Sequence, residues 1–180
     1  MKQSSVCTAT FFCCALALLS SCGGGGGGGG DDFVGAGLVT VRSSPSTIDT
    51  GDRMLVTAEV SDLHENGILL KFRYPAGLDY VLDSAELLPQ GTDNPSDIGP
   101  AVNAQQDGET FLVFFLQRSQ FGSEERGTVS FQLEGIDRVQ SGEIEVDADV
   151  NDPLVDDSAE FDPESPEFGA EDATSVSVTS

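Results

Sequence analysis

Apolar residues recur at every second position along much of this chain, and this period limits the fold more than any other feature. From Arg53 to Ser61 the apolar side chains stand at alternate positions, as a half-buried β-strand requires. No stretch of ten or more residues carries the 3.6-residue stripe of an amphipathic helix. The sequence therefore predicts an all-β domain.

Other segments show the same alternation and are separated by turn residues such as Asn66-Gly67. The segment Thr110–Leu116 is apolar on both faces, which predicts a central strand covered on both sides. About seven short strands with Gly and Pro turns are typical of an antiparallel β-sandwich of immunoglobulin-like type, here a single domain over residues 37–180. The predicted strands are Leu38–Arg42, Arg53–Ser61, Ile68–Tyr74, Leu78–Leu82 (an extension through Leu88 being left open), Thr110–Leu116, Thr128–Leu133, Glu143–Val150 and Thr174–Thr179.

Two segments between the predicted strands are polar. Pro89–Gly108 has only Ile98, Ala101 and Val102 as candidates for burial, so we interpret it as a mobile insertion rather than a binding loop. In Glu143–Val150 the four acidic residues alternate with apolar ones, which predicts a row of solvent-facing carboxylates that resists pairing with another chain.

Two family resemblances support the sandwich. Thr50-Gly51-Asp52, then Arg73-Tyr74-Pro75-Ala76-Gly77-Leu78-Asp79-Tyr80-Val81, resemble the bacterial conserved repeat called domain of unknown function 11. Asn151-Asp152-Pro153 and Glu171-Asp172-Ala173-Thr174 are similar to the last loop and closing strand of that family. Cohesin domains share the early Gly-Asp and the extended middle, and are the second choice. Either resemblance implies an immunoglobulin-like domain; members of the first family occur in exported and surface proteins.

The first 21 residues have the features of a secretory signal peptide. Lys2 is followed by the apolar run Phe11–Leu19, which is too short to span a bilayer as a helix. Leu19-Ser20-Ser21-Cys22 resembles the bacterial lipobox, which implies cleavage before Cys22 and attachment of several acyl chains to it. The alternative is ordinary cleavage with Cys22 as a bystander.

The remaining cysteines, Cys7, Cys13 and Cys14, lie in the predicted leader, so no disulfide or thiolate site is expected. Residues 22–36 form a predicted tether. Its tract Gly23–Gly30 has a mean reach of roughly 16 Å as a flexible coil. Gly23 stands where an Asp would resemble an inner-membrane retention signal. We therefore expect a lipid-anchored protein of the bacterial cell envelope, on the outer membrane if the cell is Gram-negative.

Acidic residues dominate the charge. The chain has 8 basic and 31 acidic residues, and removal of Lys2 with the leader leaves 8 − 1 = 7 basic residues and a formal charge of 7 − 31 = −24. This charge excludes nucleic acid as a partner. We interpret the acidity first as a means of keeping an exported protein soluble. The alternative is that it attracts divalent cations or a basic partner, such as an envelope or surface protein. We expect a monomer.

One acidic segment has the early spacing of a calcium loop. Asp147, Asp149 and Asn151 supply oxygen ligands at the first, third and fifth places, but Asp152 and Ser158 stand where such a loop has Gly and Glu. Asp149–Pro153 also resembles the calcium linker of cadherins. The preferred interpretation is a solvated acidic loop over residues 151–172, and calcium binding is the alternative. The candidate calcium ligands are Asp147, Asp149, Asn151, Asp152, Asp156 and Asp157.

Catalytic motifs are scarce. His64, the only histidine, lies in a predicted turn, and the sequence contains no Gly-x-Ser-x-Gly elbow. We therefore predict no catalytic residue, no enzyme activity and no cofactor other than calcium. The predicted function is non-catalytic binding or a structural role. The alternatives are a calcium-dependent adhesion or cohesin-like recognition module, and an envelope hydrolase with an unrecognised site.

Replacement of Cys22 by serine tests the anchor. We expect the wild-type protein to fractionate with membranes and to carry a lipid-sized mass on a chain that begins at Cys22. Cys22→Ser should lose both properties, because acyl chains provide the membrane affinity. Intact-mass spectrometry with membrane fractionation measures this. Wild-type protein of unmodified mass in the soluble fraction would contradict the prediction.

Overall fold

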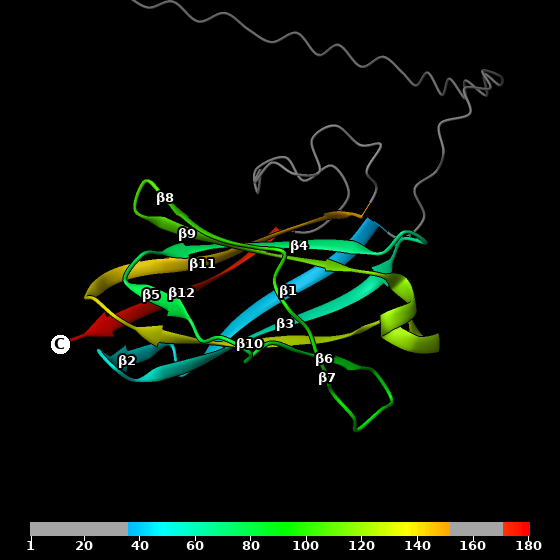
Figure 1. Cartoon of the computed structure of the whole chain (residues 1–180), viewed down its shortest axis with the longest axis horizontal. Coiled ribbons are helices and arrows are strands. Elements are labelled where there is room, and N and C mark those ends of the chain that lie inside the picture. The colour runs from blue at the N-terminus through cyan, green and yellow to red at the C-terminus, as the bar shows by residue number, and fades with distance from the viewer. Residues whose placement is uncertain (1–35, 152–170) are drawn as a thin grey trace, which may run out of the picture. The chain divides into compact units, whose positions relative to one another are not determined.

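The computed structural model describes residues 36–151 and 171–180, which form two β-sheets and one short 3₁₀ helix (Figure 1). The predicted signal peptide, Cys22 and nearly all of the tether lie outside the described residues, as do Asp152, Asp156 and Asp157. The elements are β1 (Ala36–Ser44), β2 (Thr47–Asp49), β3 (Arg53–Leu63), β4 (Ile68–Pro75), β5 (Leu78–Tyr80), β6 (Glu86–Pro89), β7 (Ser96–Asp97), β8 (Val102–Gln106), β9 (Glu109–Leu116), η1 (Arg118–Glu124), β10 (Gly127–Gly135), β11 (Val139–Val150) and β12 (Glu171–Thr179).

The strands divide into two sheets of six. The first sheet has the order β1-β3-β10-β6-β7, with β5 also paired to β10; the second has the order β2-β12-β11-β4-β9-β8. The chain passes repeatedly between the sheets, for example from β3 to β4 and from β10 to β11. Every described strand pair is antiparallel except β12 with β2. The predicted immunoglobulin-like β-sandwich is confirmed, with this one parallel pair as an addition.

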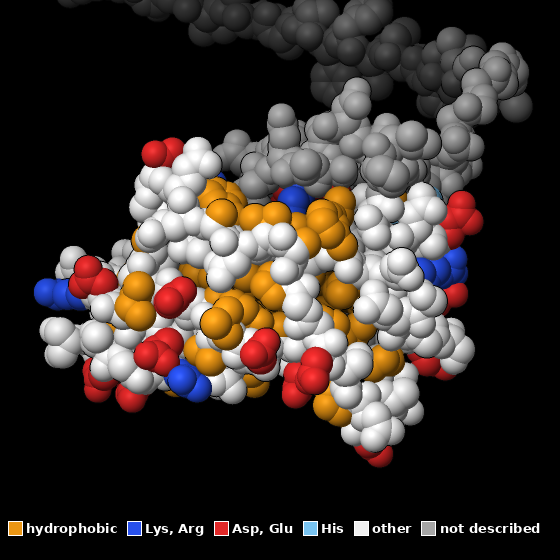
Figure 2. Space-filling view, viewed as in Figure 1, with side chains coloured by type: hydrophobic (Ala, Val, Ile, Leu, Met, Phe, Trp, Pro, Cys, Tyr) orange, Lys and Arg blue, Asp and Glu red, His pale blue; other side chains and the backbone are white. Residues whose placement is uncertain are grey.

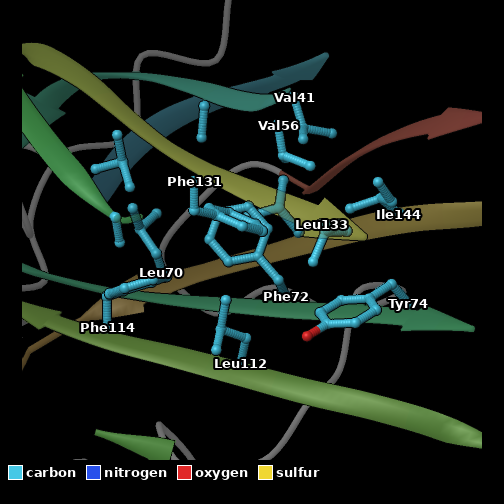
Figure 3. Close-up of a cluster of buried hydrophobic side chains, with 14 of the residues drawn as sticks. Val41, Val56, Leu70, Phe72, Tyr74, Leu112, Phe114, Phe131, Leu133 and Ile144 are labelled. Carbon is cyan, nitrogen blue, oxygen red and sulfur yellow. The ribbon is translucent and has the colours of Figure 1, made fainter. Parts of the chain in front are cut away.

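Aromatic side chains from both sheets meet in the centre of the sandwich (Figure 3). Phe72 of β4 and Phe114 of β9 face Phe131 of β10, and each is fully buried. The Phe72 and Phe131 ring centroids lie 4.9 Å apart in an edge-on arrangement, which contributes about 0.5–1.5 kcal/mol beyond the burial of area. This contact joins the second sheet to the first.

The alternation in the sequence matches the burial of the strands. In β3 the residues Met54, Val56, Ala58 and Val60 are buried, while Arg53 and Glu59 are exposed. The eight predicted strands are all present, with bounds that differ by a few residues. The open extension after Leu82 proves to be two short strands, β5 and β6, separated by a turn.

Gly67, in the turn from β3 to β4, has the positive backbone angle that the Asn66-Gly67 pair predicts. Its φ is +93°, and a Cβ at this position would lie 2.1 Å from the carbonyl oxygen of Leu116. The turn therefore requires glycine both for its conformation and for the close approach of the next segment.

The prediction that β9 is covered on both sides is wrong. One face of β9 is buried in the core, but Phe115 on the other face is 55% exposed and Phe111 and Val113 are only partly buried. The strand lies beside the edge strand β8, with which it pairs along five residues. The sequence shows that this segment is apolar, but it does not show whether another part of the protein covers the outer face of the strand.

The interpretation of Pro89–Gly108 as an insertion is also wrong, because β7 and β8 lie in it. All five residues of β8 are exposed, so the strand is formed by backbone pairing with β9 and leaves no apolar period in the sequence. Of the three candidates for burial, Ile98 packs against the core, whereas Ala101 and Val102 are exposed. β2 and η1 were not predicted either; both are short and have one buried residue each, Ile48 and Phe121.

Replacement of Phe114 by alanine tests the core. We expect Phe114→Ala to lower the free energy of unfolding by about 3–5 kcal/mol, because the fully buried ring leaves a cavity between the sheets. The matched control is Phe115→Ala, which should cost at most about 1 kcal/mol because its ring lies on the outer face. Urea denaturation measures both. Equal losses from the two variants would contradict the assignment of faces.

Candidate functional site

Three ionisable side chains meet on the outer face of the second sheet, and we call them the Lys71 cluster: Lys71 of β4, with Asp147 and Asp149 of β11. Lys71 Nζ lies 2.8 Å from Asp147 Oδ2 and also contacts Asp149 Oδ2. The three residues are 2%, 1% and 5% exposed. Burial of charge costs free energy unless the charges are paired, so this arrangement ties the three groups to one another.

Strand register brings the cluster together. β4 and β11 are antiparallel neighbours, and Lys71 stands directly opposite Asp147, with Asp149 on the diagonal. On its other side Lys71 stands opposite Val113 of β9. Leu69, which shares the outer face with Lys71, is 4% exposed. The lysine is therefore flanked by apolar residues on one side and by carboxylates on the other.

The predicted row of solvent-facing carboxylates on β11 is wrong for its second half. Asp147 and Asp149 are buried, Glu145 pairs with Arg73 at 2.7 Å, and only Glu143 is exposed. β11 lies between β12 and β4, so it is not an edge that needs protection. The pattern of β11 alone cannot show that β4 carries a lysine and an arginine opposite these positions.

The described calcium candidates are Asp147, Asp149 and Asn151. The first two contact Lys71, and the Asn151 backbone N–H donates a 3.2 Å hydrogen bond to the Gly67 carbonyl. Over residues 36–151 and 171–180, no three His, Cys, Asp or Glu side chains are grouped as a metal would require. Since the other candidates lie outside these ranges, calcium binding stays a prediction. Lys71 was not among the predicted site residues; the signal for it was a lysine inside the apolar run Ile68–Phe72.

A groove of about 450 Å³ lies on the outer face of the first sheet, and we call it the β1–β6 groove. Its floor follows one rung of paired residues, in which Thr40 stands opposite Glu59, Glu59 opposite Thr128, and Thr128 opposite Leu88. Leu38 extends the floor. Leu38 is 58% exposed and Leu88 is 37% exposed. The groove is also lined by the end of β6, the turn that follows it and Arg126: Pro89, Gln90, Gly91, Thr92 and Arg126.

The sequence pattern does not predict this groove. Alternation places Leu38 and Leu88 on strands, but it does not show that two strands far apart in the chain present them to the same hollow. The register of β1, β3, β10 and β6 decides that. Exposed apolar side chains that line one hollow are typical of a binding surface, whereas isolated ones are common on any protein.

His64 lies in the turn between β3 and β4, as predicted. Its Nδ1 accepts a 3.2 Å hydrogen bond from the Asn66 backbone N–H, so the ring supports the conformation of the turn.

Two tyrosine hydroxyls are buried near the core. Neither Tyr74 Oη nor Tyr80 Oη has a hydrogen-bond partner among the described residues. Burial raises the pKa of the Tyr74 phenol far above its ordinary value of 10.0, and the charges of Asp79 and Tyr80 raise it further. The fold therefore holds Tyr74 in its neutral form.

Comparison with known proteins finds similarity of structure alone. No protein-family model matches the sequence, and neither does any curated protein. Among solved structures, AvmM, which catalyses macrocyclization in alchivemycin A biosynthesis, is 10% identical with a TM-score of 0.49, over 81% of this chain and 90% of AvmM. The non-cellulosomal cohesin from the archaeon Archaeoglobus fulgidus is 12% identical with a TM-score of 0.40, over 80% of this chain and 91% of the cohesin.

The T6 backbone pilin of serotype M6 Streptococcus pyogenes is also similar, with 11% identity and a TM-score of 0.44, over 79% of this chain and 36% of the pilin. The chain thus spans about a third of the pilin's length. These scores are too low to transfer a function, and the fold assignment rests on the two sheets themselves. In the part of the chain that the structure describes, no helix has the length and apolar character needed to cross a membrane.

Tyr74 gives a prediction for alkaline pH. In the unfolded chain this phenol ionises near pH 10.0, whereas the folded protein keeps it protonated. The free energy of unfolding therefore keeps its full value below pH 10.0 and decreases above it. We expect the free energy of unfolding to fall above pH 10.0 by about 1.4 kcal/mol per pH unit from this residue. In Tyr74→Phe this loss should be absent, and the variant should be as stable as the parent or more so at pH 7, because no hydrogen bond is removed. Denaturant titrations of the parent and of Tyr74→Phe at pH 7, 10 and 11 measure the free energy of unfolding of each. An equal decrease with pH in the two proteins would contradict the prediction.

Proposed function

We propose that this protein is a lipid-anchored component of the bacterial cell envelope whose β-sandwich is a non-catalytic recognition module. We further propose that the β1–β6 groove receives an extended, basic segment of a partner protein. The observation that supports this most is the pair of exposed leucines, Leu38 and Leu88, at the floor of one groove in a strongly acidic chain.

The apolar part of the groove would provide affinity. Burial of apolar surface contributes about 25 cal/mol per Å². Leu38 and Leu88 are partly exposed in the free protein, so a bound partner could bury more of their surface. The rung between them carries Thr40, Glu59 and Thr128, whose backbones already pair within the sheet. A partner would therefore contact side chains on this face. Leu38 and Leu88 lie on β1 and β6, three strand spacings or about 14 Å apart. An extended segment laid across the groove would contact both leucines and place its other side chains beside these polar groups.

Charge would select the partner. The chain has a formal charge of −23, and acidic side chains are spread over the face seen in Figure 2, where basic ones are few. A field of this sign accelerates association with basic surfaces and repels acidic ones. Glu59 lies in the floor of the groove and offers a carboxylate to a Lys or Arg.

The anchor would place this groove at the membrane surface. Acyl chains on Cys22 would hold the protein, and the glycine tract that follows would let the domain turn toward partners. Gly23 after the lipidated cysteine favours the outer membrane in a Gram-negative cell. This part of the proposal rests on the lipobox resemblance.

Site-specific photo-cross-linking on intact cells tests the recognition role. A photoreactive residue at position 88 should give a discrete adduct, whereas the same residue at position 82 should give none. Leu82 is the matched control because it is 76% exposed but does not line the groove. In the position-88 protein, Glu59→Lys should weaken the adduct about tenfold, equivalent to about 1.4 kcal/mol of binding. No adduct from position 88, or equal adducts from both positions, would contradict the proposal.

A further inference from the structure

We propose that Lys71 and Asp149 condense to an intramolecular amide bond that joins β4 to β11. The Lys71 cluster brings an amine, a carboxyl group and a second carboxyl group into contact in a buried place. This reaction is separate from the recognition role and does not involve the β1–β6 groove.

The reach of the lysine side chain selects Asp149 as the partner. Residues on the diagonal of an antiparallel pair have Cβ atoms somewhat less than about 7–8 Å apart, whereas directly opposite residues are about 4.5–5.5 Å apart. An extended lysine side chain that ends in an amide fits the longer span. Asp149 stands on the diagonal to Lys71, and its Oδ2 contacts Nζ.

Asp147 is then placed to move protons. Its Oδ2 lies 2.8 Å from Nζ, directly across the strand pair. Transfer of one proton from the ammonium to Asp147 leaves a neutral amine with a free electron pair. A further proton must reach the oxygen that leaves Asp149, and Asp147 can deliver it from the same position.

The atoms balance without another reactant. The Nζ electron pair attacks Asp149 Cγ, a C–N bond forms, and one Cγ–O bond breaks. An ammonium and a carboxylate are converted into one amide and one water molecule, and Asp147 ends in its starting protonation state. Because the three residues are at most 5% exposed, bulk water has little access to reverse the reaction.

Such a bond would take the place of a disulfide. All four cysteines lie at or before position 22, so the described domain has none. Lys71 and Asp149 are 78 positions apart in the chain, and a covalent link between them would restrict the unfolded state over that length. The sandwich would gain resistance to unfolding in an exported protein.

Peptide mass spectrometry of the full chain tests the proposal. With the bond present, trypsin cannot cleave after Lys71, and we expect residues 54–73 joined to residues 139–180 at their summed mass less one water molecule. Fragmentation should place the link at Asp149. This readout does not depend on the fate of the leader, because both peptides lie within the domain.

Three variants identify the roles. Lys71→Arg should abolish the joined species. Asp147→Asn should also abolish it, since the proton carrier is lost. Asp149→Asn should retain the link but form it with loss of ammonia instead of water, which distinguishes amide formation from dehydration elsewhere. Unlinked peptides 54–71 and 139–180 from the wild-type protein would overturn the proposal, and a link at Asp147 would overturn the assignment of roles.

Discussion

Burial of alternating apolar side chains between two sheets is the constraint on which the rest of this structure depends. Phe72 and Phe131 meet from opposite sheets, with ring centroids 4.9 Å apart, and the other core residues pack around them (Figure 3). Because side chains on a strand alternate, the inward direction of Phe72 forces its neighbour Lys71 to the outer face. The positions of both candidate sites follow from the core in this way.

The two outer faces have different chemistry. The first sheet presents exposed leucines, the Glu59 carboxylate and the Arg126 guanidinium in a hollow, which suits reversible contact with another protein. The second sheet holds a buried lysine between two aspartates, which suits an interaction within the chain. The β1–β6 groove and the Lys71 cluster therefore lie on opposite sides of the sandwich, so a variant in one can be tested without changing the other.

Prediction from the sequence succeeded where a pattern is local. The eight strands were found because each buried face repeats every two residues, as in Met54–Val60, and the Asn66-Gly67 turn because its residue types are specific. Prediction failed where a strand forms through backbone pairing with its neighbour and not through a buried face. β8 has no buried residue, and the exposed side of β9 looks as apolar as its buried side in sequence. A local period carries no information about which strand lies alongside or whether anything covers the outer face.

The sequence by itself determined an all-β domain, the faces of its main strands, its acidity and the expectation of a lipidated Cys22, because each depends on residues close together in the chain. Only the tertiary structure decided that Lys71 stands opposite Asp147, 76 residues later, and that Leu38 and Leu88 share one groove. Strand order and register are set by how the whole core packs. Contacts between distant strands are therefore products of the fold rather than of any single segment.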